Sequence, residues 1–249
     1  DNPKVLVFDF GAGTCDVSII ELGKDLNGIY SKNLSISKFE KIGGDDLDRF
    51  IALEYLFPQL LNENKLTKAD FKTPEKNRII TQLLKAAEQL KILICDSVAK
   101  QMNDKLLPTL AIAKDYQSLG YTIEIDSKKG LLKLTEPKLS YQEFSESMKT
   151  FLKSNSLIPK KGSEGQNDFV SVFSPIHTAM KKANLTKSEI DYVLFIGGSC
   201  KNPYVQNALK EYFTDSDLLI PTDLQTHVST GAAIHSLIYN GFNKNIIQP

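Results

Sequence analysis

The sequence predicts a mixed α/β fold. Strand patterns cluster near the start of the chain, where the apolar run at residues 5–10 is bounded by Gly11. A second buried strand is expected at 192–196, and helical patterns follow it at 201–213 and 224–239. The chain has 249 residues, of which 41% are hydrophobic, and a chain of that size buries roughly 70–75% of its unfolded surface. This alternation favours parallel pairing of 192–196 with the first strands.

The remaining elements follow from periodicity and helix-start signals. Further strands are expected at 16–22, 34–42, 121–126 and 130–135, and the last two should form a hairpin. Further helices are expected at 47–61, 73–95, 140–153 and 169–184. Asp45 or Asp46 can cap the first of these helices, and Thr73 with Pro74 opens the second. Residues 154–168 have the composition of a loop, and 98–120 show no clear pattern.

Composition excludes several classes of protein. Basic and acidic residues both number 30, so the basic excess typical of a nucleic-acid binder is missing. No apolar run approaches the roughly 20 residues of a membrane helix. The three cysteines lie far apart and form no C-x-x-C motif, which indicates a reducing compartment, taken to be the cytoplasm. Only Arg49 and Arg78 are arginines, so a phosphate site would depend on backbone amides and lysines.

A glycine-rich turn follows the first strand. Asp9 ends the strand, and Gly11 and Gly13 let the main chain fold closely around an anion. Thr14 adds a hydroxyl group and Asp16 a second carboxylate. Carboxylates beside a phosphate nest suit hydrated Mg²⁺. The alternative is an ordinary glycine-rich hairpin with solvated aspartates, and no Lys-Ser or Lys-Thr follows that would make it a P-loop.

A second glycine turn ends the strand at 192–196. Gly197, Gly198 and Ser199 follow this strand, and Pro203 begins a helix. Such an exit lets a ligand approach the main chain at the carboxyl end of a strand. The alternative is a helix-entry turn with no ligand.

A third signal lies on the helix expected at 73–95. Glu88, Lys91 and Cys95 are spaced by three and four residues, so they share one helix face. A carboxylate and an amine there can hydrogen-bond a ribose, while the alternative is a surface ion pair. A zinc site is disfavoured, because no histidine accompanies the cysteines in sequence.

Five ordered segments resemble one protein family. They read DFGAGTCDVSIIELG (9–23), KIGGDDLDRF (41–50), LLKAAEQLKILICDS (83–97), IDYVLFIGGSCKNPYVQ (190–206) and GAA (231–233). Together they are similar to the second lobe of the nucleotide-binding domain of the DnaK-like seventy-kilodalton heat-shock chaperones, in the actin-like ATPase superfamily. The implied fold is ribonuclease-H-like over 1–42 and 155–249 (subdomain IIA). An inserted α+β subdomain (IIB) would span 43–154.

The resemblance also implies roles for residues in binding ATP or ADP with Mg²⁺. Those implied at the β- and γ-phosphates are Gly11, Ala12, Gly13 and Thr14. Asp9 would hold Mg²⁺ through water, and Asp16 would lie near the attacking water or a cation, so Asp9, Thr14 and Asp16 form the implied catalytic set. Those implied around the adenosine are Glu88, Lys91 and Cys95 on one side and Gly197, Gly198, Ser199 and Lys201 on the other. Gly43 and Gly44 would begin the outer subdomain, with Gly44 also in the binding set.

Several positions depart from the family pattern. Ala12 replaces a glycine, Ile92 an arginine that stacks on adenine, Cys95 a serine and Lys201 an arginine. Residues 98–120 resemble an insertion. These departures support an alternative in which a degenerate nucleotide site serves as an interaction scaffold. Another actin-like ATPase, such as a filament former or a sugar kinase, is a third reading.

The family's first lobe, with its phosphate hairpin and catalytic lysine, is not found in the sequence. Neither is the peptide-binding β-sandwich. The chain is therefore expected to be part of a longer protein and to lack ATP hydrolysis by itself. Its expected partners are the first lobe and a nucleotide-exchange or co-chaperone protein on the outer subdomain, with no nucleic acid and no membrane.

Overall fold

The computed structural model describes residues 2–26, 28–37, 40–102, 116–153, 171–224 and 226–239. The chain divides into two compact units. The first contains Asp1–Gly44 and Leu152–Pro249, and the second contains Asp45–Phe151. The loop predicted at 154–168 and most of the unassigned segment at 98–120 lie outside the described residues.

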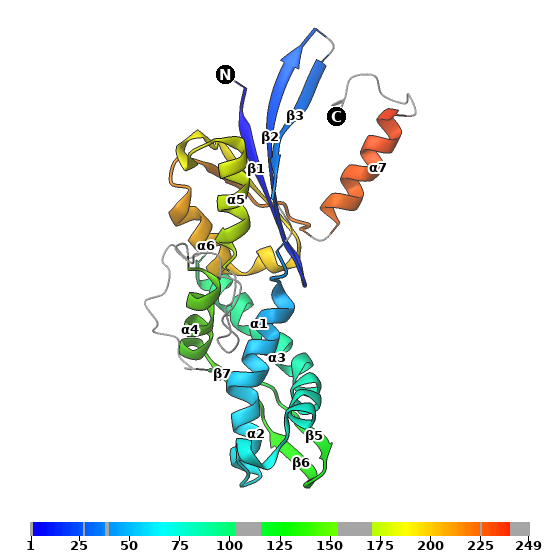
Figure 1. Ribbon diagram of the computed structural model, residues 1–249, viewed down its shortest axis with the longest axis vertical. Coiled ribbons are helices and arrows are strands. Elements are labelled where there is room, and N and C mark those ends of the chain that lie inside the picture. The colour runs from blue at the N-terminus through cyan, green and yellow to red at the C-terminus, as the bar shows by residue number, and fades with distance from the viewer. Residues whose placement is uncertain are drawn as a thin grey trace. The chain divides into compact units, whose positions relative to one another are not determined.

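A five-stranded mixed sheet forms the centre of the first unit (Figure 1). Its strands are β1 (Lys4–Phe10), β2 (Cys15–Asp25), β3 (Gly28–Ile36), β8 (Tyr192–Ile196) and β9 (Asp217–Leu219). Their order is β3-β2-β1-β8-β9, with β1, β2 and β3 antiparallel and β8 parallel to both β1 and β9. The predicted parallel pairing of 192–196 with the first strands is confirmed.

The boundaries predicted for the third strand were wrong. We expected 34–42, whereas β3 spans Gly28–Ile36 and pairs with a longer β2, from Asp25↔Gly28 onward. Because β3 lies at the edge of the sheet, its first residues show no alternation of apolar and polar side chains. Strand β9 also lies at an edge and was missed for the same reason.

Among the described residues, three helices and two short turns complete the first unit. They are α5 (Phe173–Ala183), α6 (Pro203–Tyr212) and α7 (His227–Tyr239), with the short 3₁₀ turns η3 (Lys187–Glu189) and η4 (Gly198–Lys201). Helix α5 packs on β2 and β3, where Ser35 Oγ donates a hydrogen bond to the Ala179 carbonyl at 2.8 Å. Phe8 and Phe195 are fully buried and meet edge to face at 6.0 Å between ring centroids. This packing holds β1 and β8 together at the strands that carry the two glycine turns.

The second unit begins with a helical run that contains a π-helical turn. The run consists of α1 (Gly44–Ile51), the π-turn η1 (Ala52–Leu56) and α2 (Phe57–Glu63), where one helix was predicted at 47–61. Phe57 N donates to the Ala52 carbonyl, five residues back, and Pro58 lies in the first turn of α2. A proline lacks an amide hydrogen and clashes with the carbonyl four residues earlier in an α-helix. The wider turn accommodates this change of register.

The rest of the second unit is built around one long helix. Its elements are η2 (Lys68–Asp70), α3 (Thr73–Met102), α4 (Tyr141–Phe151), β4 (Tyr116–Ser118), β5 (Thr122–Ser127), β6 (Gly130–Thr135) and β7 (Lys138–Ser140). The hairpin predicted at 121–135 is confirmed as β5–β6. Helix α3 extends beyond the predicted end at Cys95, because the buried Val98 continues its apolar face past the polar Asp96 and Ser97.

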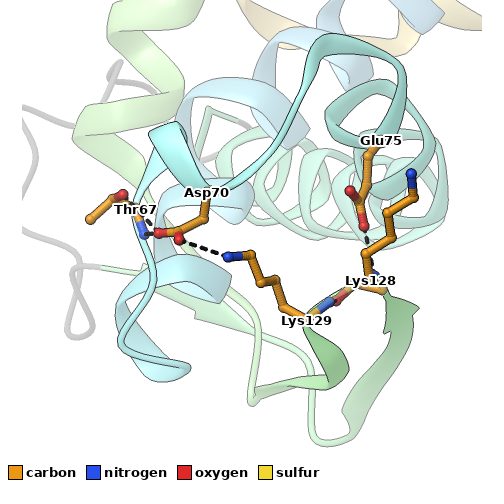
Figure 2. A network of polar contacts seen from close by, with 6 residues as sticks. Thr67, Asp70, Glu75, Lys128 and Lys129 are labelled. Carbon is orange, nitrogen blue, oxygen red and sulfur yellow. Dashed lines mark hydrogen bonds and ion pairs between the residues drawn. The ribbon is translucent and has the colours of Figure 1, made fainter.

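The turn of the β5–β6 hairpin is held by polar contacts to two neighbouring segments (Figure 2). Lys129 Nζ pairs with Asp70 Oδ1 at 3.2 Å, and the Lys128 amide donates to Glu75 Oε1 at 2.7 Å. Asp70 also accepts from the Thr67 amide and hydroxyl, which fixes the carboxylate. These contacts anchor the hairpin to η2 and to the start of α3.

Candidate functional site

The first glycine turn joins β1 to β2 and is closed by its own main chain. The Gly11 amide donates to the Thr14 carbonyl at 3.0 Å, and Ala12, Gly13 and Thr14 are exposed. Below the turn, Cys15 and Glu40 exchange two main-chain hydrogen bonds of 3.0 and 3.1 Å. The result is a tight loop that presents residues 12–14 outward from a fixed base.

Two further glycines support this turn from behind. The Gly44 amide donates to the Gly11 carbonyl at 3.1 Å. A Cβ atom on Gly43 would lie 2.0 Å from the Ala12 carbonyl oxygen, so a side chain there is excluded. The sequence predicts Gly43 only as the start of the outer subdomain, and its role in supporting the turn was missed. The Gly-Gly pair was the available signal, but its partner lies some thirty residues earlier in the chain.

The second glycine turn lies directly against the first. Gly197 has φ +88°, and a Cβ atom there would lie 2.4 Å from the Phe10 carbonyl oxygen and 2.9 Å from Asp9 Oδ1. Ser199 Oγ donates to the Gly11 carbonyl at 2.7 Å. Parallel pairing explains the proximity, since Ile196 at the end of β8 is the register partner of Asp9. The two turns predicted from separate motifs therefore meet at one edge of the sheet. Lys201, at the end of η4, is exposed.

Two carboxylates lie side by side at this edge. Asp9 and Asp16 are direct partners in the β1–β2 register, so their side chains share one face of the sheet. Burial, and next the Asp16 charge, raise the pKa of Asp9 above its usual value. Neighbouring carboxylates repel each other, and a cation would remove that repulsion. Within the described ranges no three potential ligand side chains cluster as a metal site. Two neighbouring carboxylates suit Mg²⁺, which takes few direct ligands from a protein and keeps several waters.

The predicted face of α3 contains a buried ion pair. Lys91 Nζ donates to Asp48 Oδ2 at 2.7 Å, and the two side chains are 16% and 8% exposed. Glu88 is exposed, while Cys95 is buried and burial raises the pKa of its thiol to about 12. Ile92, at the position of the family's stacking arginine, is 47% exposed. Sequence reasoning named Lys91 as a site residue but missed its partner Asp48, because 43 residues separate the two in the chain.

The other two cysteines lie in the core of the first unit. Cys15 and Cys200 are both fully buried, and burial raises the pKa of Cys200 to about 12. Cys200 Sγ donates to the Ile196 carbonyl at 2.9 Å. Protonated, packed thiols of this kind fill space behind the two turns.

A shallow cleft of about 550 Å³ lies in the second unit, lined by Pro74, Glu75, Arg78, Asp126, Ser127 and Lys128. Arg78 Nη2 donates to the Asp126 carbonyl at 2.7 Å, and Glu75 accepts from the Lys128 amide. Because these polar groups are hydrogen-bonded to one another, we interpret the cleft as the base of the β5–β6 hairpin and not as a binding site.

Comparison with known families identifies the group to which the protein belongs. The family model described as "Hsp70 protein" matches residues 1–161 and 165–247. The chain belongs to the Hsp70 family. Its resemblance to these chaperones is thus confirmed, and its mixed α/β content and multi-stranded sheet fit the actin-like ATPase fold of Hsp70 proteins.

A curated relative shows how much of an Hsp70 protein this chain corresponds to. "Chaperone protein DnaK 3" of Synechococcus sp. is 28% identical over 249 residues. The match covers 99% of this chain but only 32% of the relative, so the chain spans about a third of that protein's length. Among the described helices of this Hsp70 protein, none is both long and apolar enough to cross a bilayer.

Proposed function

We propose that this Hsp70 chain is the second lobe of the ATP-binding domain of a longer chaperone and binds the phosphates of ATP and ADP together with Mg²⁺. The contact between the two glycine turns, beside the Asp9–Asp16 carboxylate pair, carries the proposal. Main-chain turns without side chains let an anion approach the backbone closely. A carboxylate pair next to them receives the accompanying cation.

The first unit would supply the phosphate contacts. Gly11, Ala12, Gly13 and Thr14 would lie against the β- and γ-phosphates, with hydrogen bonds donated by the main chain of the turn and by the Thr14 hydroxyl. Asp9 would hold Mg²⁺ through water, and Asp16 would lie near the attacking water or a second cation. When bound, Mg²⁺ neutralises charge on the phosphates. Gly43 and Gly44 would keep the turn in shape from behind.

Nucleoside contacts are proposed for each unit separately. In the first unit they comprise Gly197, Gly198, Ser199 and Lys201. In the second unit they comprise Glu88, Lys91 and Cys95, which share one face of α3. Family membership supports these assignments, and the spacing of the motifs agrees with them.

The proposed organisation follows the family. Residues 1–42 and 155–249 would form subdomain IIA, and 43–154 the inserted subdomain IIB. In the intact protein, ATP binding and hydrolysis would change the affinity of another domain for its substrate, a coupling between two sites. The first lobe of the same domain and a nucleotide-exchange or co-chaperone protein at subdomain IIB are the proposed partners, in the cytoplasm. Without the first lobe, half of the electrostatic environment of the transferred phosphate is missing, so this chain alone would not hydrolyse ATP.

A second candidate function is a nucleotide-independent scaffold. The exposed Ile92, at the position of the family's stacking arginine, favours it. The extra methyl group of Ala12 in the phosphate turn points the same way.

Calorimetry separates the two candidates. Mg²⁺·ADP is titrated into the two-lobe protein, into its Asp9→Asn variant, and into Asp215→Asn, an exposed aspartate of the first unit, as the control. We expect binding in the wild type and the control, and an affinity about tenfold weaker or more in Asp9→Asn, since a charge-assisted contact is lost. No heat and no thermal stabilisation in any protein would favour the scaffold. Steady-state ATP hydrolysis by the isolated chain, abolished by Asp9→Asn, would show that it is active alone.

A further inference from the structure

A buried carboxylate in the second unit has only one of its two oxygens hydrogen-bonded. Asp48 lies on α1, and its side chain is 8% exposed. Its Oδ2 accepts from Lys91 Nζ at 2.7 Å, while its Oδ1 is buried with no hydrogen-bond partner among the described residues. Buried polar atoms are nearly always paired, so this oxygen requires an explanation.

The surroundings make the charge of Asp48 costly. Asp45 on the same helix and Glu88 on α3 add negative charge, and among the described residues Lys91 opposes it. Burial is the main effect, and the pKa of Asp48 rises to about 6 despite the ammonium group. At neutral pH the carboxylate is charged. Its contribution to the unfolding free energy is therefore lower there than at acidic pH, where the carboxyl group is protonated in both the folded and the unfolded chain. Well-packed apolar residues would serve stability better than such a pair.

What the charge does is hold Lys91. The ammonium group is 16% exposed, on the same face of α3 as Glu88 and Cys95. A lysine side chain has four rotatable bonds, and a short charge-assisted hydrogen bond restricts where its ammonium group lies. A residue that lowers stability while fixing a partly exposed cation fits a functional site better than a structural one.

We propose that Asp48 is a positioning residue: it gives up stability to hold the Lys91 ammonium group where it meets the hydroxyl groups of a nucleotide's ribose. This inference rests on the proposed function, because it takes the nucleotide as the ligand. Asp48 acts through Lys91 and does not itself contact the ribose. Its removal should therefore change discrimination between sugars more than binding of phosphates.

The test compares two ligands in three proteins. Affinities for Mg²⁺·ADP and Mg²⁺·2′,3′-dideoxy-ADP are measured by calorimetry with the full-length protein, with Asp48→Asn, and with Glu54→Gln, an exposed carboxylate in the same helical run, as the control. Wild type and control should prefer ADP by about tenfold or more, the worth of a hydrogen bond from a charged donor. Asp48→Asn should reduce this preference to about threefold or less, and its urea midpoint at pH 7.5 should equal or exceed that of the wild type.

Each outcome decides between the proposals. Wild-type preference retained in Asp48→Asn would overturn the positioning role and leave nucleotide binding intact. Absence of binding to either nucleotide in the wild type would overturn the proposed function, and this inference with it. If Asp48→Asn does not fold, the wild type alone decides. Its preference for ADP should fall between pH 7.5 and pH 5.5, as Asp48 takes up a proton, and a constant ratio would refute the role. The ionisation of the ADP phosphates cancels in that ratio.

Discussion

The two glycine turns of the first unit and the Asp48–Lys91 pair of the second achieve placement by different means. The turns are held by main-chain contacts, and glycine is needed because other backbone atoms occupy the space of a side chain. The pair is held by charge between two side chains from helices α1 and α3. A site held by main-chain contacts should therefore be destabilised by added side-chain volume and be insensitive to pH. A buried charge pair should instead be sensitive to pH and tolerate a change of side-chain volume.

The largest expected effect comes from adding one methyl group to the turns. Gly197→Ala would place Cβ 2.4 Å from the Phe10 carbonyl oxygen at φ +88°, and Gly43→Ala would place it 2.0 Å from the Ala12 carbonyl oxygen. Since backbone must move in both cases, each variant should lose about 3 kcal/mol or more of unfolding free energy, measured by urea denaturation.

Gly13 provides the matched control for these variants. A Cβ atom there meets nothing within 4 Å, so Gly13→Ala should stay within about 0.5 kcal/mol of the wild type. Equal losses in all three variants would contradict the distinction between supporting and exposed glycines.

The next effect comes from removing the cation of the pair. Lys91→Met leaves the buried Asp48 carboxylate without its counter-ion, and the carboxylate then takes up a proton. At pH 7.5 this costs about 2 kcal/mol, because Asp48 must be protonated above a pKa of about 6. At pH 5.5 the loss should nearly vanish. Lys85→Met, at an exposed position of α3, should show no such pH dependence in urea denaturation, and an equal loss at both pH values would argue against the charge explanation.

A smaller effect is expected in the pH dependence of the wild type itself. The pKa of Asp48 is about 6 in the folded chain against 3.8 for the unperturbed group. Its contribution to stability is therefore present at low pH and is lost as pH rises through about 6. Between pH 5 and pH 7.5 the loss amounts to about 1.4 kcal/mol. The unfolding free energy of Asp48→Asn relative to wild type should rise by that amount over the same interval, whereas Glu54→Gln should show a constant difference.

The smallest effect concerns the one side-chain bond described between the two turns. Ser199→Ala removes the hydroxyl group that donates to the Gly11 carbonyl and should cost about 1 kcal/mol of unfolding free energy at any pH from 5 to 8. Ser229→Ala, at an exposed position of α7, should change stability by about 0.5 kcal/mol or less. A pH-dependent loss in Ser199→Ala would show that the turns also depend on charge.

Much of the fold was predictable because its signals are local. The strand at residues 192–196 has the predicted bounds, and the β5–β6 hairpin is formed as expected. The first is predicted from a continuous apolar run that ends in two glycines, and the second from alternation on either side of a turn. The bounds of edge strand β3 were wrong, and edge strand β9 was missed. An edge strand pairs with a single neighbouring strand, so its sequence need not show a clear hydrophobic pattern. The predicted end of α3 was also wrong, because the polar residues Asp96 and Ser97 interrupt the sequence pattern before the buried Val98.

The sequence by itself determined the family and the two glycine-rich motifs, because short runs of neighbouring residues carry them. It also predicted the parallel pairing of β1 with β8 from the alternation of strands and helices, although the two strands lie far apart in the chain. Only the tertiary structure decided that Gly197 contacts the backbone of Phe10, that Gly43 lies under Ala12, and that Lys91 pairs with Asp48. Those facts depend on distances between segments that are far apart in sequence. A side chain's burial and the charge beside it arise only when the segments have packed.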